Sequence, residues 1–217
     1  MKTIPSRAPK RAFTLIELLI VMAFVCFLAM FLFPVGPHTK VSATRIRCVN
    51  NLKQVGLSFR TWALDYKDQF PMQVHGTNGG TMELASTAPA FMHFLVLSNE
   101  LSTPKILFCP SDKRPGPPTN FISDLDNSKI SYFVGVDAVQ TSPQMFLAGD
   151  RNITNGIATR RGFLELTTNQ MAGWTHELHK GQGNVGLADG SVQQFSTSRL
   201  RQAIEATGVA TNRLAMP

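Results

Sequence analysis

The most uniform apolar pattern of the chain lies close to its N-terminus. Residues 13–33 form a run of 21 residues in which only Thr14 and Glu17 are not apolar. Such a run predicts a helix that is apolar on every side and long enough to cross the roughly 30 Å hydrocarbon core of a bilayer. Residues 1–12 precede it with four basic side chains and no acidic one.

Residues 34–67 show a different pattern, in which apolar residues recur at steps of three and four between polar ones. This periodicity predicts an amphipathic helix from about residue 41 to residue 67. Pro34 and Pro37 precede it, and proline removes a backbone donor and clashes with the preceding turn. We therefore expect one long N-terminal helix that is kinked near Pro34, with its first half in lipid and its second half packed on the rest of the chain.

Residues 68–217 alternate short apolar runs with turn residues, which predicts one globular head domain with a small antiparallel sheet. Strands are expected at 106–109, 130–136, 145–148, 162–166, 184–187 and 191–195, and short helices at 91–101 and 198–207. Asp189 and Gly190 fall between the last two strands and predict the tip of a hairpin. The predicted fold class is α+β, with the long helix laid against the sheet.

The junction at residues 10–21, KRAFTLIELLIV, resembles the N-terminus of type IV pilins and of the pseudopilins of type II secretion. The resemblance implies that residues 1–12 are a prepilin leader, that prepilin peptidase cuts between Ala12 and Phe13, and that the new amine of Phe13 is methylated. Ala12 departs from the family pattern, in which glycine usually precedes the cut.

Glu17 is the one acidic residue in the apolar run, and a carboxylate within a membrane is costly unless it has a partner. The resemblance implies that Glu17 faces the amine of Phe13 on its own or a neighbouring subunit when the helices pack in a filament. Burying that charge pair costs less than burying either charge alone. Glu17 is therefore the residue expected to govern filament assembly.

His179, nine residues and then Asp189-Gly190 match the H-X9-DG signature at the C-terminus of a large pilin-like family, here residues 179–190. Segments 48–57, 107–112 and 147–151 also resemble segments of that family. In a structural interpretation, Asp189 and Gly190 close a hairpin and His179 forms a hydrogen bond across it. In a functional one, Asp150 and Asp189 supply oxygen ligands to a calcium ion, as in major secretion pseudopilins, although six ligands are not evident.

Charge and cysteine content refine this interpretation. The chain carries a formal net charge of +7, but four of its 21 basic residues lie in the leader, which leaves 17 basic against 14 acidic residues. That balance does not require a nucleic-acid partner. Cys48 and Cys109 fall where the head is expected to be exported, so a Cys48–Cys109 disulfide is one expectation and two buried free thiols the other. Neither cysteine has zinc-motif spacing, so we expect no zinc site.

No catalytic motif is evident, so the chain is interpreted as a substrate of an enzyme and not as an enzyme. The leading hypothesis is a pilin-like structural subunit of a type II secretion pseudopilus or a type IV pilus-like filament. Its expected partners are prepilin peptidase, other pilin-like subunits and an inner-membrane assembly platform. Its expected location is the inner membrane as a single-pass protein, with the head outside the cytoplasm, and the filament after assembly.

The sequence is also compatible with other interpretations. The chain could be an ordinary secreted protein cut after Ala43, or its apolar run could be an uncut anchor or a buried core helix. The alternative function is a membrane-anchored binding module of the cell envelope that does not polymerise. An exported hydrolase or metal enzyme would require catalytic ligands that the sequence does not reveal.

Overall fold

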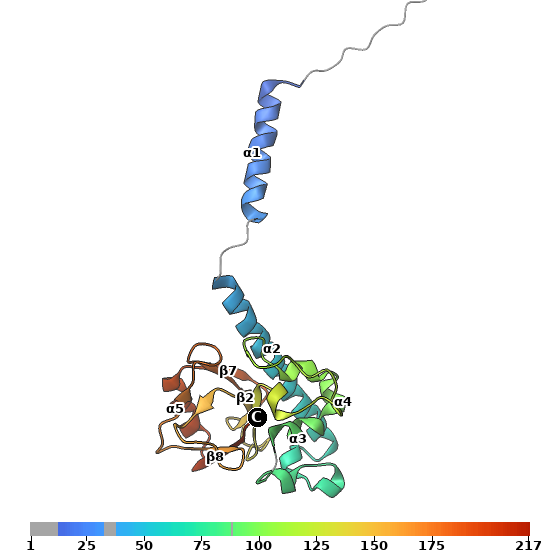
Figure 1. Ribbon diagram of the computed structural model, residues 1–217, viewed down its shortest axis with the longest axis vertical. Coiled ribbons are helices and arrows are strands. Elements are labelled where there is room, and N and C mark those ends of the chain that lie inside the picture. The colour runs from blue at the N-terminus through green and yellow to red at the C-terminus, as the bar shows by residue number, and fades with distance from the viewer. Residues whose placement is uncertain (1–12, 33–37, 88) are drawn as a thin grey trace, which may run out of the picture. The chain divides into compact units, whose positions relative to one another are not determined.

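A computed structural model describes residues 13–32, 38–87 and 89–217, in two compact units that comprise residues 1–40 and 41–217 (Figure 1). The leader with Ala12 and the expected kink at Pro34 lie outside the described residues. Of the helices that the described residues form, none combines the length and the apolar character needed to cross a membrane. The first unit contains helix α1 (Leu15–Leu32), which is apolar apart from Glu17.

Helix α2 (His38–Asp65) contributes an apolar face to the core of the second unit. Its buried hydrophobic residues recur mainly at steps of three and four, as the sequence predicts; they are Cys48, Leu52, Val55, Phe59, Trp62 and Ala63. The helix ends in a Schellman-type turn, in which the amide of Asp68 donates to the carbonyl of Ala63 while Lys67 adopts a left-handed φ of 56°.

The second unit is built around a six-stranded antiparallel sheet with the strand order β4-β8-β1-β2-β6-β7. The strands are β1 (Tyr132–Gly135), β2 (Phe146–Asp150), β4 (Phe163–Thr167), β6 (Gly183–Leu187), β7 (Val192–Phe195) and β8 (Thr211–Ala215). A separate two-stranded sheet pairs β3 (Ile153–Thr154) with β5 (Gly173–Trp174).

Helices cover both faces of the main sheet. One core contains the inner face of α2 together with α3 (Ala90–Leu95) and α4 (Ser98–Leu101), and the other contains α5 (Thr197–Ala206) (Figure 1). Successive side chains of strand β1 point to opposite faces of the sheet. Tyr132 and Val134 therefore belong to the first core and Phe133 belongs to the second. The connections contain 3-10 helices η1 (Pro71–Gln73), η2 (Gly76–Asn78), η3 (Met82–Leu84), η4 (Pro104–Leu107) and η5 (Asn127–Lys129).

The α+β class with an antiparallel sheet is confirmed, but three local predictions differ from the structure. The strand predicted at 106–109 is wrong: η4 occupies its first half, because Pro104 fixes a helical φ and Thr103 accepts a hydrogen bond from the amide of Lys105. The helix predicted at 91–101 is divided into α3 and α4. Strand β8 was not predicted, although it lies inside the sheet between β4 and β1.

Candidate functional site

The first unit presents an apolar helix with one carboxylate at its start. Nearly all side chains of α1 that the structure describes are exposed, including Phe13 just before it. The Glu17 carboxylate accepts hydrogen bonds from the backbone amide and the hydroxyl of Thr14, both at 2.9 Å. This is the capping-box arrangement of a Thr followed three residues later by a Glu. Glu17 and Thr14 therefore cap the start of α1.

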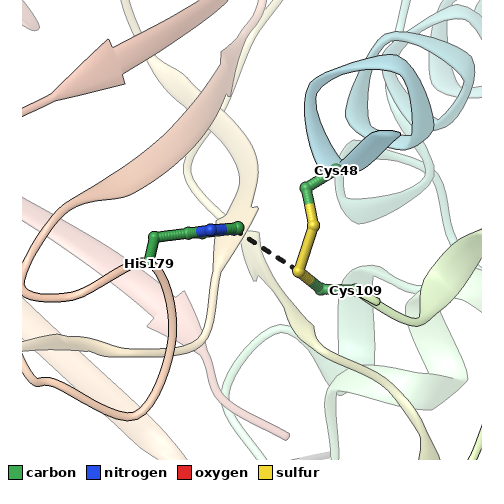
Figure 2. A group of neighbouring side chains, drawn as sticks. All are labelled: Cys48, Cys109 and His179. Atoms are coloured by element: carbon green, nitrogen blue, oxygen red, sulfur yellow. Dashed lines mark hydrogen bonds between the residues drawn. A yellow bond between two sulfur atoms is a disulfide. The ribbon is translucent and has the colours of Figure 1, made fainter. Parts of the chain in front are cut away.

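The four segments that resemble the pilin-like family meet at one buried place in the second unit. Cys48 comes from α2, Cys109 from the loop after η4, Asp150 from the end of β2, and His179 from the loop before β6. We call these four residues the motif cluster. All four are buried, and Figure 2 shows the imidazole of His179 pointing at the sulfur atoms of the two cysteines. Segments up to 131 residues apart along the chain thus form one polar site inside the core.

Cys48 and Cys109 form a disulfide in the structure, with an S–S distance of 2.12 Å and Cα atoms 5.3 Å apart. The disulfide ties α2 to the head across 61 residues of sequence. The Nε2 atom of His179 lies 3.4 Å from the Cys109 Sγ (Figure 2). The same atom lies 3.4 Å from the Asp150 Oδ2. The imidazole therefore lies between the disulfide and a carboxyl group.

Asp150 is the most deeply buried ionisable group of the motif cluster. Its Oδ2 accepts hydrogen bonds from the backbone amide of Asn184 at 2.7 Å and from the Asn184 side chain at 2.8 Å. Its Oδ1 is buried and makes no hydrogen bond. Burial raises the pKa of Asp150 to about 7. A carboxyl group in this position is held partly in its neutral form near pH 7.

Like Asp150, His179 is held in its neutral form by its surroundings. Burial, together with the positive charge of Arg45, lowers the pKa of His179 to about 4, so the imidazole is neutral at pH 7. Its backbone adopts a left-handed φ of 44°, which side-chain-bearing residues rarely adopt. Arg45 donates a hydrogen bond from Nη2 to the carbonyl oxygen of His179 at 2.8 Å, and this contact holds the loop against α2.

A set of ion pairs around Asp112 lies beside the motif cluster and joins segments 107–112 and 147–151. Asp112, from the segment after Cys109, accepts hydrogen bonds from the Arg151 guanidinium at 2.9 and 3.1 Å and from the Ser131 hydroxyl at 2.8 Å. Arg114 donates to the same carboxylate. Burial alone raises the pKa of Asp112, but the two guanidinium groups and Ser131 outweigh it and hold this pKa well below its usual range.

The hairpin predicted at Asp189-Gly190 is present between β6 and β7. The Asp189 side chain accepts a hydrogen bond from the amide of Ser191 at 2.8 Å, and Gly190 adopts a φ of 87°. The predicted hydrogen bond of His179 across this hairpin is wrong, because His179 lies at the other end of β6. The two ends of the H-X9-DG segment instead contact α2, where Arg45 donates to His179 and Arg60 to the carbonyl of Asp189.

The two candidate calcium ligands are not brought together. Asp150 lies beside Asn184 at the start of β6, whereas Asp189 follows the end of that strand. Within the described part of the chain, one group of three or more potential metal ligands lies close together, namely Cys48, Cys109 and His179. Sequence spacing did not reveal this group, because its members come from three distant segments.

A cleft of about 420 Å³ opens on the surface near β4. Three arginines line it together with one acid, and its lining residues are Ala85, Ser86, Arg160, Arg161, Phe163, Glu165 and Arg213. Arg213 is paired with Asp137, so its charge is partly compensated. The cleft has the charge to hold an anionic group.

No protein-family model, no curated protein and no solved structure matches this chain. The likeness to pilins therefore rests on the chain's own sequence motifs.

Proposed function

We propose that the protein is a pilin-like structural subunit. Prepilin peptidase cuts it between Ala12 and Phe13, and an assembly platform in the inner membrane adds it to a filament of pilin-like subunits. The filament is a type II secretion pseudopilus or a type IV pilus-like fibre. Residues 13–33 hold the subunit in the membrane before assembly, and the head remains outside the cytoplasm.

The observation that carries this proposal is the surface of α1. A helix whose apolar side chains are exposed on every side, with one carboxylate in its first turn, requires an apolar environment that also supplies a positive charge. A bundle of identical helices meets both needs, because each helix covers its neighbours and each cut N-terminus provides an amine.

The outer face of α2 supports the same proposal. Ile46, Leu57 and Leu64 are 60%, 64% and 72% exposed, although the opposite face of the helix is buried. At 3.6 residues per turn these three side chains lie within about 20° of one line along the helix, over about 27 Å. An exposed apolar line of this length is suited to packing against the helix of another subunit.

The mature N-terminus tests the proposal directly. We expect mass spectrometry of the intact membrane-bound protein and of its N-terminal peptide to find a chain that begins at N-methylated Phe13. A chain that begins near Thr44 would identify an ordinary secreted protein. Retention of residues 1–12 in the mature protein would identify a static anchor, and either result would refute the proposed pathway.

Two variants separate the role of the Glu17 charge in filament assembly from the role of its side chain as a helix cap. Glu17→Gln keeps an oxygen that can accept from Thr14 but removes the charge, whereas Thr14→Ala removes the cap and keeps the charge. Loss of one partner from a buried ion pair typically costs 3–5 kcal/mol. We therefore expect Glu17→Gln to lower the sheared filament fraction by about tenfold or more, and Thr14→Ala to change it little.

Both variants should still be found in the membrane fraction in normal amounts. Equal filament yields from the wild type and Glu17→Gln would show that pairing with the Phe13 amine does not drive assembly. A loss that is larger for Thr14→Ala would assign the effect to the helix cap.

A non-polymerising, membrane-anchored binding module is the second candidate, and the arginine-lined cleft near β4 is the observation that favours it. In that case the head binds an anionic glycan or a protein of the envelope. Leader retention and the absence of the protein from sheared filaments, together with ligand binding that Arg160→Ala abolishes, would support this candidate over the first.

A further inference from the structure

We propose that reduction of the Cys48–Cys109 disulfide converts the motif cluster into a zinc site, with Cys48, Cys109, His179 and Asp150 as its four ligands. This inference is independent of filament assembly, because it concerns the core of the second unit. Two thiolates, one imidazole and one carboxylate form a donor set that Zn²⁺ accepts in proteins.

Three of the four ligand atoms are already close together, and the carboxylate of Asp150, which is near His179 but outside this group of three, must move closer to the sulfur atoms. The sulfur atoms of Cys48 and Cys109 and a ring nitrogen of His179 lie within 4.8 Å of one another. With Zn–S bonds of about 2.3 Å and Zn–N or Zn–O bonds of about 2.0–2.1 Å, tetrahedral N···S and N···O distances are about 3.6 and 3.4 Å. The observed distances from His179 Nε2 to the Cys109 Sγ and to the Asp150 Oδ2 are both 3.4 Å.

The cysteine side chains must move for the site to form. The two sulfur atoms are bonded in the structure, whereas two thiolates on one zinc lie about 3.8 Å apart by the same bond lengths. The Cα atoms, 5.3 Å apart, allow this separation through rotation of the side chains. The backbone of α2 and the loop after η4 can therefore stay in place.

The surroundings of Asp150 favour its use as the fourth ligand. Its Oδ1 is fully buried and makes no hydrogen bond, which is a costly state for a carboxyl oxygen. Its Oδ2 is oriented by the two hydrogen bonds from Asn184, as an outer-shell partner orients a metal ligand. Arg45, which contacts the His179 carbonyl, offsets the excess negative charge of two thiolates and a carboxylate around one divalent ion.

Reduction of the Cys48–Cys109 disulfide requires a two-electron reductant, such as a dithiol or a phosphine. The reductant transfers two electrons to the S–S bond, and the two sulfur atoms take up two protons and become thiols. A dithiol reductant is oxidised to a disulfide in this reaction. A phosphine instead takes up the oxygen of water and becomes a phosphine oxide. Zn²⁺ then displaces the two thiol protons to solvent without changing its own oxidation state. In the disulfide form the sulfur atoms are bonded to each other and are not thiolate ligands. Zinc binding and the disulfide therefore exclude each other.

The test uses the full-length chain in detergent, treated with a chelator and then divided into oxidised and phosphine-reduced samples. After incubation with ZnCl₂ and desalting, zinc per chain is measured by inductively coupled plasma mass spectrometry. We expect about one zinc per reduced chain and none per oxidised chain. The thermal unfolding midpoint of the reduced chain should rise when zinc is added, because zinc binds the folded state.

Variants identify the site. Loss of an outer-shell partner typically weakens metal binding 10–100-fold, so loss of a ligand in His179→Ala or Asp150→Ala should weaken it by at least about 100-fold. His176→Ala is the matched control, because His176 is exposed and lies three residues from His179. Cys26→Ser controls for the free cysteine of α1. Both controls should bind zinc as the wild type does.

Three results would overturn the proposal. The first is a reduced chain that takes up no zinc, whether or not it remains folded. The second is zinc uptake that His179→Ala leaves unchanged. The third is equal uptake by the oxidised and reduced chains, which would place the metal elsewhere. None of these results depends on whether the protein polymerises.

Discussion

At the scale of single residues, His93 shows how burial turns an ordinary side chain into a pH-dependent element of the fold. The side chain lies in α3 and is fully buried, with Nδ1 2.9 Å from the hydroxyl of Thr81 and Nε2 without a hydrogen bond. Burial lowers the pKa of His93 to about 4. Protonation inside the core is costly because no acceptor receives the second N–H.

This shift predicts a loss of stability in acid. The unfolded chain takes up a proton on His93 near pH 6.5, whereas the folded chain takes it up only near pH 4. The free energy of unfolding should therefore fall as the pH is lowered from about 6.5 to about 4, and by about 3 kcal/mol through this residue. In His93→Leu this part of the pH dependence should disappear, as measured by urea unfolding between pH 4 and 8.

The pH dependence of the free energy of unfolding must be compared between His93→Leu and the wild type, because His179 and Asp150 also change their protonation over this range. His176→Gln, which replaces an exposed imidazole, should follow the wild-type curve. Parallel curves for the wild type and His93→Leu would show that the buried imidazole does not control the acid response.

At the scale of elements, the structure shows how α2 is held to the head. The disulfide lies in its first half, Arg45 contacts the loop of His179, and Arg60 contacts the hairpin loop fifteen residues later. Gly56 lies between the two contacts, where its backbone approaches Gly190 closely: a Cβ atom on Gly56 would lie 3.9 Å from the Gly190 Cα. The H-X9-DG segment therefore docks the helix at two places.

The disulfide should contribute strongly to this docking. It closes a loop of 61 residues, for which loss of chain entropy in the unfolded state predicts about 4 kcal/mol of stabilisation. We expect the double variant Cys48→Ser with Cys109→Ser to lose about that much free energy of unfolding in a metal-free buffer. Cys26→Ser should lose little, since Cys26 forms no disulfide. A loss below about 1 kcal/mol in the double variant would contradict a major role for the disulfide.

At the scale of the whole molecule, exposed apolar side chains are concentrated on two helices. They cover α1 and form one line along the outer face of α2. Away from these helices, large exposed apolar side chains occur singly, as Ile122 does in a loop. Single exposed apolar residues are common on soluble domains, whereas ordered arrays indicate contact surfaces.

The line on α2 can be tested by one substitution and its matched control. Leu57→Gln should lower the filament fraction several-fold while it leaves the thermal midpoint of the head unchanged, because the side chain is exposed in the single subunit. Ile122→Gln also replaces an exposed apolar residue but lies outside the line, and it should assemble normally. If both variants assemble as the wild type does, α2 makes no lateral contact through this face.

The sequence alone determined the elements whose pattern is local. The apolar run of α1, the spacing of Leu52, Val55 and Phe59 on α2, and the short apolar runs of five of the strands were all readable, because each is a pattern among residues that are near one another in the sequence. Gly190 and Asp189 predicted their turn for a similar reason: a left-handed φ and a side-chain hydrogen bond to the amide two residues on are local properties.

Only the tertiary structure decided the rest. Strand β8 has an irregular polar pattern, since Asn212 is buried and Arg213 is paired with Asp137, and it became a strand because β1 and β4 offered hydrogen bonds on both sides. The contacts of His179 with Asp150 and Cys109 likewise could not be predicted from the sequence, because these residues lie 29 and 70 positions away from it. Spacing along a chain gives the period of an element, but which elements meet is set by how their buried faces pack.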